Sequence, residues 1–310
     1  MQGKMKESFT EKNRELAIEF NSMIEEFKEG LWRYCRYLTG SPWDGEDLFQ
    51  DTMLKAFGGY YQRWHPTNPK AYLYRMATTT WIDQCRKEKR HVGLLEEDEL
   101  PQENFTDGLE AEEALHILFD LFYPRQVAVF LLKEVFRFDA REVAGMVRTT
   151  PGAVYATVRR MKEKLQSVDL LESRSQHPVS DTHPVIQAYL NAMNEGDIEA
   201  VMALISEEAH NEAALGFQEY SKGEMRSGSM KYGLPGMRAV EYSLWGRHVI
   251  VMLSEGTNGP EIHDIQYQEV ENGKIVHHIS YYFRKELIFA AGEELGIRPQ
   301  IDKPVVEWNG

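Results

Sequence analysis

The stretch from residue 44 to residue 90 constrains the fold most, because it predicts two amphipathic helices in succession. Asp44 is a suitable N-cap for the first helix, and acidic residues follow it in the first turn, where the helix dipole favours them. Apolar side chains then recur at helical spacing and predict one buried face: Phe49, Met53, Ala56, Phe57 and Tyr60. Four polar side chains fall outside that face and form a predicted acidic ridge: Glu46, Asp47, Gln50 and Asp51.

The second helix begins at about Lys70, after a polar connector that contains Pro66 and Pro69. Aromatic residues crowd this region, and its end is basic. Because bases stack on aromatic rings and phosphates attract Lys and Arg, this composition favours binding of single-stranded DNA. Each feature alone is as typical of a helical hairpin with an aromatic core and a solvated, charged end.

In their linear order, these residues resemble region 2 of the extracytoplasmic-function (ECF) sigma factors of bacteria. The resemblance rests on residues 44–57, on Ala71-Tyr72-Leu73-Tyr74-Arg75-Met76-Ala77 and on Ile82-Asp83. It implies that the first helix docks on the beta-prime clamp helices of core RNA polymerase through the acidic ridge. It implies that the second helix and the loop before it open and read the minus-ten promoter element. The DNA-binding residues carried over are Trp64, Arg75, Trp81, Arg86, Lys87, Lys89 and Arg90. The chain departs from many relatives at Thr78 and Thr79, where Arg and Asn are common.

The net charge of −14 is unevenly distributed along the 310 residues. Residues 91–113 hold nine Asp and Glu and no Lys or Arg, so the rest of the chain carries only −5. Local basic patches therefore decide whether nucleic acid is bound.

Several classes of protein are disfavoured by the composition. Cys35 and Cys85 are the only cysteines and lack metal-ligand spacing, so a reduced cytoplasmic location fits better than disulfides. No apolar run approaches the roughly 20 residues of a membrane span, and the first residues lack a signal-peptide core. We expect no membrane attachment, no cofactor and no metal site.

Before residues 44–90, a further helix is predicted that runs to Thr39 and is ended by Gly40. With it, the predicted helical domain spans residues 11–90. An acidic linker follows at residues 91–108. In the sigma family the equivalent linker threads a polymerase channel otherwise used by nucleic acid.

A helix-turn-helix is predicted within residues 109–167. Asp139 with Glu142 resembles a capping box, and Thr150 before Pro151 marks the start of the last helix. The second helix of such a motif enters the major groove, although ordinary helical pairs share the pattern.

The residues that flank this motif resemble region 4 of the ECF sigma factors. They are Tyr123-Pro124-Arg125-Gln126 and Arg159-Arg160-Met161-Lys162-Glu163-Lys164-Leu165. Region 4 binds the minus-thirty-five element and the beta flap of the polymerase. The DNA-binding residues that the resemblance implies are Thr149, Thr150, Tyr155, Arg159, Arg160 and Lys162.

After a second linker at residues 168–183, residues 184–298 predict an α+β domain. Two helices, the second capped by Asp197, precede strands at 237–244, 248–253 and 261–270, and Asn272-Gly273 is a strong hairpin turn. A helix at 285–295 closes the domain. This order, with Asn194-Glu195-Gly196-Asp197-Ile198-Glu199-Ala200, resembles the SnoaL-like group, an α+β cone whose curved sheet encloses a cavity.

The hairpin register predicts which side chains face that cavity. A two-residue turn pairs Gln268 with His277 and Asp264 with Tyr281, so Asp264, His277 and Tyr281 share one face. A carboxylate and an imidazole suit acid–base catalysis, but no enzyme-specific motif is present, and we expect no catalytic activity. Binding of a small-molecule ligand in this cavity is a further hypothesis.

We therefore expect a multidomain chain with two all-α DNA-binding domains followed by an α+β SnoaL-like cone. The predicted function is that of an alternative sigma factor, with core RNA polymerase and promoter DNA as partners and the cone regulating activity in cis. Two alternatives remain: a ligand-sensing helix-turn-helix regulator, and a SnoaL-like enzyme fused to a DNA-binding module.

Overall fold

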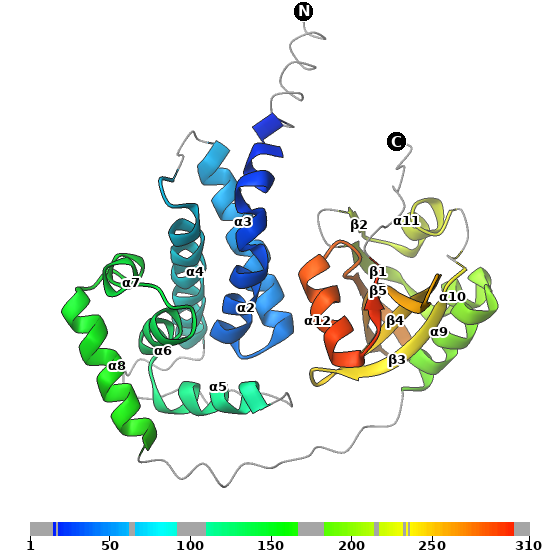
Figure 1. The fold of residues 1–310 in the computed structure, drawn as a ribbon. Helices are drawn as coiled ribbons and strands as arrows, with labels where there is room; N and C mark the ends of the chain where they lie inside the picture. Colours follow the sequence, from blue (N-terminus) through cyan, green and yellow to red (C-terminus); the bar gives the residue numbers. More distant parts are fainter. Residues whose placement is uncertain are drawn as a thin grey trace, which may run out of the picture. The chain divides into compact units, whose positions relative to one another are not determined.

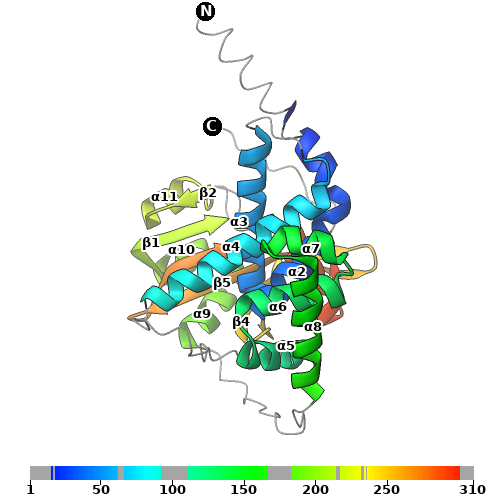
Figure 2. The ribbon, with the colours of Figure 1, turned by 90° about the vertical axis from the view of Figure 1, so that its left-hand side faces the viewer.

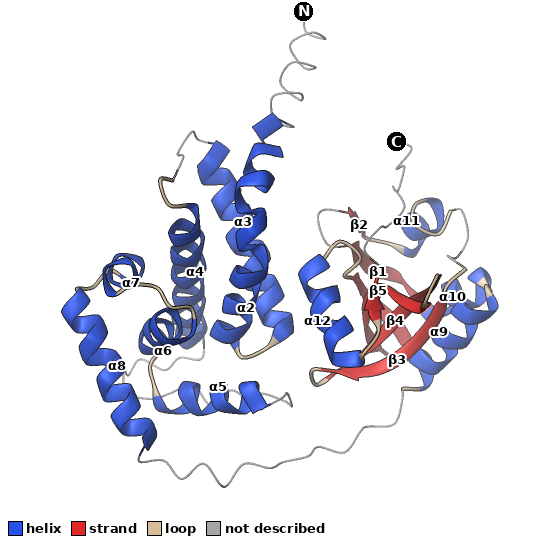
Figure 3. Ribbon diagram, viewed as in Figure 1, coloured by secondary structure: helices blue, strands red, loops and turns tan. Residues whose placement is uncertain are grey.

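The computed structural model describes residues 15–16, 18–61, 66–91, 110–166, 183–213, 217–231, 234 and 236–300. The chain divides into two compact units, residues 1–176 and residues 177–310. Among the described residues, the first unit is helical and every strand belongs to the second (Figure 3). The predicted fold class, helical domains followed by an α+β domain, is confirmed.

The helices of the first unit fall into two groups (Figure 1). The N-terminal group comprises η1 (Glu25–Phe27), α2 (Lys28–Thr39), α3 (Pro42–Tyr61) and α4 (Pro69–His91). The C-terminal group comprises α5 (Glu110–Leu121), α6 (Pro124–Phe130), the π-helical segment η2 (Leu131–Val135), α7 (Ala140–Val147) and α8 (Pro151–Gln166).

Helix α3 begins two residues before the predicted N-cap, because Pro42 occupies the first helical position. The Oγ atom of Ser41 accepts a hydrogen bond from the backbone N–H of Asp44 at 3.4 Å. The prediction that Asp44 caps this helix is therefore wrong. Gly40 ends α2 in the left-handed conformation with φ of 72°, as its position in the sequence predicts.

Local capping fixes the helix-turn-helix. Asp139 accepts hydrogen bonds from the backbone of Arg141 and Glu142, and the Glu142 side chain accepts one from the Asp139 backbone, which confirms the capping box. Thr150 caps α8 through a 3.2 Å bond from the Ala153 N–H. One guanidinium Nη2 of Arg125, in α6, donates to the carbonyl oxygens of Val147 and Arg148, each at 2.6 Å. Arg125 thus ties the turn to α6.

The two helical groups contact each other through aromatic rings. Phe138, after η2, packs on Tyr74 of α4, and Phe136 packs edge-on against Tyr34 of α2 with centroids 5.1 Å apart. All four side chains are at least partly buried, and Tyr34 and Tyr74 are almost wholly so. The segments predicted as separate domains, 11–90 and 109–167, therefore share one compact unit.

The second unit contains a mixed sheet with helices around it (Figures 1 and 2). Its helices are α9 (Pro184–Glu195), α10 (Ile198–Leu204), α11 (Lys222–Ser227) and α12 (Lys285–Leu295). Its strands are β1 (Ile205–Ala213), β2 (Phe217–Glu219), β3 (Arg238–Leu244), β4 (Arg247–Gly256), β5 (Gly259–Glu271), β6 (Lys274–Ser280) and β7 (Arg298–Pro299). The strand order is β2-β1-β6-β5-β4-β3, with β7 beside β5; β1 runs parallel to β6.

One predicted turn and one long-range side-chain contact hold this domain together. Asn272 and Gly273 form the β5–β6 turn with φ of 49° and 75°, the positive values that a two-residue hairpin turn requires. Asn194 brackets the backbone of Ala239: its Nδ2 donates to the carbonyl at 2.9 Å and its Oδ1 accepts from the N–H at 2.7 Å. This side chain fixes the end of α9 to β3.

Each of two strands carries one extra residue that changes which side chains share a face. In β6, Glu269 pairs with His277 and Val270 with Ile275, so Val276 is the extra residue. In β5, Met252 of β4 pairs with Asp264 and Leu253 with Ile262, so His263 is the extra residue. Such bulges redirect side chains, because the side-chain period of a strand is two.

Candidate functional site

The outer face of α3 is an exposed stripe of Asp44, Asp47, Asp51 and Leu54. The spacing of three and four residues places these side chains on one side of the helix. Leu54 is 68% exposed, which is high for a leucine. Two of the four predicted ridge residues, Asp47 and Asp51, lie on this stripe.

Glu46 does not belong to the exposed ridge. It is fully buried, its Oε2 accepts a hydrogen bond from the Trp32 indole Nε1 at 2.7 Å, and its Oε1 accepts one from Gln50 Nε2 at 2.7 Å. Gln50 is half-buried by the same contact. The prediction of an exposed Glu46 is wrong, because the carboxylate satisfies a buried indole N–H of α2.

The basic end of α4 is accessible as far as its side chains are described. Arg75, Arg86 and Lys87 are exposed, and Arg86 forms an ion pair with Asp83 at 3.4 Å. Lys89 and Arg90 belong to the helix, but their side chains lie outside the described residues, as does Trp64.

Trp81 does not present its ring to solvent. It is 6% exposed, and its ring lies 6.2 Å from that of Phe119 in α5. In this arrangement Trp81 is a packing residue between the two helical groups and cannot stack on a base.

Thr78, one of the two departures from the family pattern, is buried at the α2–α4 contact. Its Oγ1 lies 2.8 Å from the hydroxyl of Tyr34 and donates to the carbonyl of Tyr74 at 2.7 Å. An arginine would not fit this fully buried position without displacing Tyr34.

The outer face of α8 carries the predicted recognition residues. Val154, Val158 and Met161 face inward, whereas Tyr155 is 61% exposed and Arg159 and Arg160 are exposed. The remaining predicted residues lie nearby: Lys162 is exposed and pairs with Glu134 at 2.5 Å, Thr150 is exposed, and Thr149 is half-buried in the turn. Five of these six side chains are therefore open to a partner.

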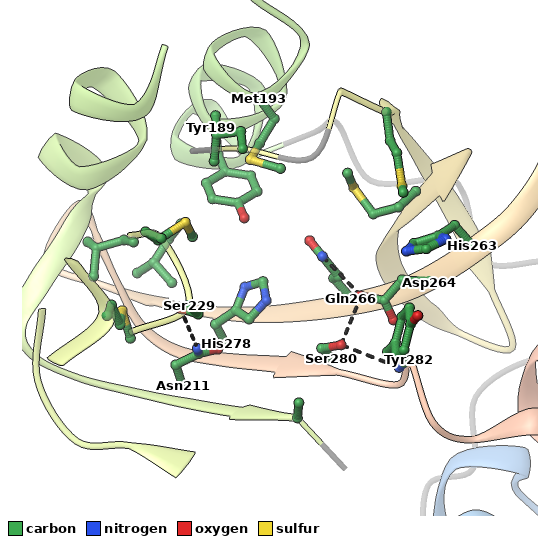
Figure 4. Close-up of a pocket in the computed structure, with 18 of the residues that line it drawn as sticks. Tyr189, Met193, Asn211, Ser229, His263, Asp264, Gln266, His278, Ser280 and Tyr282 are labelled. Carbon is green, nitrogen blue, oxygen red and sulfur yellow. Dashed lines mark hydrogen bonds between the residues drawn. The ribbon is translucent and has the colours of Figure 1, made fainter. Parts of the chain in front are cut away.

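The second unit encloses a cavity of about 230 Å³ between α9, α11 and the sheet. Five methionines line it, together with aromatic and aliphatic side chains: Met193, Met225, Met230, Met237 and Met252. Figure 4 shows Tyr189 reaching into the cavity opposite Asp264, Gln266 and Ser280 of the sheet. The lining is thus mostly apolar, with one polar side.

The polar side is a connected set of hydrogen bonds. Asp264 Oδ2 accepts from Ser280 Oγ at 2.8 Å and from Gln266 Nε2 at 3.1 Å. Burial raises the pKa of Tyr189, and the charge of Asp264 adds to that rise. Burial, with a smaller contribution from His277, lowers the pKa of His278 to about 4. The cavity therefore holds an imidazole that is neutral at physiological pH.

Of the three predicted cavity residues, only Asp264 lines this cavity. The extra residue Val276 shifts the register, so Gln268 pairs with His278 and not with His277. His278 consequently faces the cavity, and His277 lies on the opposite face of β6. Tyr281 is buried, but the neighbouring Tyr282 takes its place in the lining. The predictions for His277 and Tyr281 are wrong for this reason.

No described helix combines the length and the apolar character that a bilayer crossing requires.

Comparison with known proteins identifies the helical half of the chain. Residues 23–91 match the family model of Sigma-70 region 2. The ECF RNA polymerase sigma factor SigG of Mycobacterium tuberculosis is 26% identical over 226 residues, which covers 62% of this chain and 60% of SigG. The RNA polymerase sigma-E factor of Streptomyces avermitilis is 28% identical over 168 residues, covering 50% of this chain and 89% of that protein.

Among solved structures, the extracytoplasmic function sigma factor SigJ of Mycobacterium tuberculosis is similar, and the alignment covers 84% of this chain and 95% of SigJ at 18% identity and a TM-score of 0.32. The region 2 match falls on α2, α3 and α4, and the second unit has the predicted helix-helix-sheet order around a cavity. The chain therefore contains a Sigma-70 region 2 and is similar to the ECF RNA polymerase sigma factors, and an α+β domain follows its helical unit.

Proposed function

We propose that this chain is an alternative sigma factor that binds core RNA polymerase, recognises promoter DNA and melts it, acting by binding and without turnover. The observation that carries the proposal is the exposed stripe on α3, where Asp47, Asp51 and Leu54 face outward. A charged rim beside an exposed leucine suits an interface with a basic and partly apolar protein surface. The clamp helices of the beta-prime subunit are the proposed partner of this stripe.

Two further surfaces support promoter binding. Exposed Arg75, Arg86 and Lys87 line α4, and exposed Tyr155, Arg159 and Arg160 line the recognition helix α8. We assign the first surface to the minus-ten element and the second to the minus-thirty-five element. The beta flap remains the proposed polymerase contact of the C-terminal helical group.

Run-off transcription with purified core polymerase tests the proposal, with the region upstream of the chain's own gene among the templates. The double variant Asp47→Lys with Asp51→Lys is expected to lose most core binding and most transcript while keeping the wild-type thermal midpoint. The matched control is Glu255→Lys with Glu271→Lys, which makes the same charge change at exposed positions of the second unit. Equal core affinity for the two double variants would remove α3 from the interface.

The second unit is proposed to regulate the sigma factor in cis. The linker at residues 168–183 is short, so a domain attached through it stays at high effective concentration near the helical unit, and even a weak contact is substantially populated. Two truncations test this proposal: one ends at Gln166, and the other ends before Lys285 and removes α12. If both transcribe at the full-length rate from the same promoter, cis regulation is wrong.

A second candidate function, ligand sensing, rests on the cavity. Its 230 Å³ lies below the roughly 300–1,000 Å³ of drug-sized pockets, so it fits a small molecule with one polar end. Filling it from the Tyr189 side, with Met193→Trp, should mimic the ligand-bound state in the transcription assay. Hydrolase or cyclase activity would instead require turnover that Asp264→Asn and His278→Gln abolish.

A further inference from the structure

Two histidines and one glutamate meet on the sheet of the second unit. His210 and His277 are direct neighbours across the parallel β1–β6 pair, and their rings stack with centroids 4.9 Å apart and planes at 7°. Glu212 lies two residues further along β1, and its Oε1 is 3.5 Å from His277 Nε2. One nitrogen or oxygen atom from each of the three side chains lies within 4.8 Å of the other two.

This cluster is separate from the cavity. Asn211 and Ala213 line the cavity, so His210 and Glu212, which alternate with them along β1, face the other side of the strand. On β6, the cavity takes His278, and His277 faces the opposite side together with His210. The cavity and the cluster therefore occupy opposite faces of the same two strands.

The cluster holds unsatisfied ligand atoms. The Nε2 atoms of His210 and His277 are shielded from solvent, and neither has a hydrogen-bond partner among the described residues. Burying such an atom without a partner is unfavourable, and an ion bound between the side chains would offset that cost. The side chains of Glu212 and His277 are 31% and 25% exposed, so an ion can enter from solvent.

We propose that His210, Glu212 and His277 form a binding site for a divalent transition-metal ion, with Zn²⁺ as its expected occupant. Two imidazoles and one carboxylate are a ligand set that such ions accept in proteins, leaving a further position for water. Metal–ligand bonds of roughly 2.1 Å place tetrahedral ligands about 3.4 Å apart. The Glu212–His277 separation of 3.5 Å already matches that distance, and the ligand atom of His210 lies within 4.8 Å of the other two.

The surroundings of the cluster suit this role. A carboxylate oxygen of Glu269 lies 3.7 Å from Nδ1 of His277, on the side of the ring away from Glu212. A carboxylate in that position orients a metal-bound imidazole and raises its basicity. Tyr220 stacks on His210, with planes at 5°, and holds that ring in place. Because the ligands come from β1 and β6, the ion would join the first long strand to the last hairpin.

Metal content of the full-length protein tests the inference. The chain is stripped with a chelator, loaded with ZnCl₂ and dialysed, and bound zinc is counted by mass spectrometry and titrated by calorimetry. We expect one ion per wild-type chain with a Kd in the micromolar range or below, and a higher thermal midpoint for the second unit. His210→Gln, Glu212→Gln and His277→Gln should each weaken binding at least tenfold.

The matched control is His248→Gln, which removes an exposed histidine beside Glu241 at 3.2 Å, on β4. It should retain the wild-type affinity and stoichiometry. Glu212→Gln keeps the size of the side chain, so it decides the outcome if a histidine variant folds poorly. Wild-type binding no tighter than millimolar, or equal zinc content in the control and the three ligand variants, would overturn the proposal.

Discussion

The ring of Phe138 packs against the ring of Tyr74, with centroids 4.8 Å apart and planes at 62°. This contact joins the helix-turn-helix to α4, the helix proposed to read the minus-ten element. The Lys70 Nζ atom lies over the Phe138 ring, 5.0 Å from its centroid. If α4 binds the minus-ten element and α8 the minus-thirty-five element, roughly 25 base pairs or about 85 Å of duplex lie between the two sites, and we expect this contact to open on the promoter.

The first prediction is that Phe138→Ala releases the C-terminal helical group. The variant loses a ring that is 4% exposed, so the free energy needed to separate the two helical groups falls. Hydrogen exchange should accelerate in α7 while α2 and α3 keep their protection, and transcription should rise or stay level. Phe289→Ala, which truncates a ring that is 46% exposed in α12, is the control. Equal acceleration throughout the first unit would show a shared core in place of a separable contact.

The second prediction separates folding from docking on α3. Glu46→Ala leaves the buried Trp32 indole N–H without its acceptor, which should cost about 1–3 kcal/mol of the free energy of unfolding. Asp47→Ala, one residue away and exposed, should leave the unfolding free energy within about 0.5 kcal/mol of wild type. Denaturant titration measures both. A stable Glu46→Ala variant would contradict the assignment of Glu46 to packing.

The third prediction concerns the salt dependence of promoter binding. Arg160 is exposed on α8, and its Nε donates to the Ala156 carbonyl at 3.2 Å. If Arg160 contacts one phosphate, Arg160→Ala should reduce the slope of log affinity against log salt by about one. Fluorescence anisotropy on a minus-thirty-five fragment measures the slope. Arg238→Ala, an exposed arginine of β3, should leave it unchanged; a loss in both variants would indicate a nonspecific charge effect.

The fourth prediction is a pH dependence set by His278. Its folded-state pKa of about 4 lies below the unfolded value of roughly 6.5, so the unfolded chain binds more protons between these pH values. Stability of the second unit should therefore fall as pH drops from about 6.5 to about 4, with no further contribution from this group outside that window. His278→Gln should flatten the decline in calorimetric scans. An unchanged decline would place the responsible group elsewhere.

Local signals in the sequence predicted much of the fold. The Asp139 capping box, the Thr150–Pro151 helix start and the Asn272–Gly273 turn depend on neighbours within four residues, and all three form as predicted. Strand β1 was not predicted, because its run of Glu, Ala and His lacks alternation and favours a helix. Pairing with β2 and β6 overrides that preference.

Site residues were harder to predict where distant partners decide their environment. The residues next to Glu46 do not indicate that it accepts a hydrogen bond from the indole of Trp32, which lies 14 residues earlier in the sequence. Trp81 has an aromatic ring of the kind that stacks on bases, yet Phe119 of α5 packs against it. Glu46 stands three residues before Phe49 and Trp81 four residues after Ala77, so helical spacing places both on buried faces, and the packing of another helix covers them.

The extra residue Val276 decides which of two adjacent histidines serves which face of the sheet. A regular hairpin that took Val276 into the ladder would instead pair Gln268 with His277 and move His278 to the opposite face. Deleting Val276 would remove the bulge and keep both histidines beside their present partners, Glu269 and Gln268. Relatives aligned across this turn should accordingly be compared by strand register before they are compared by residue identity.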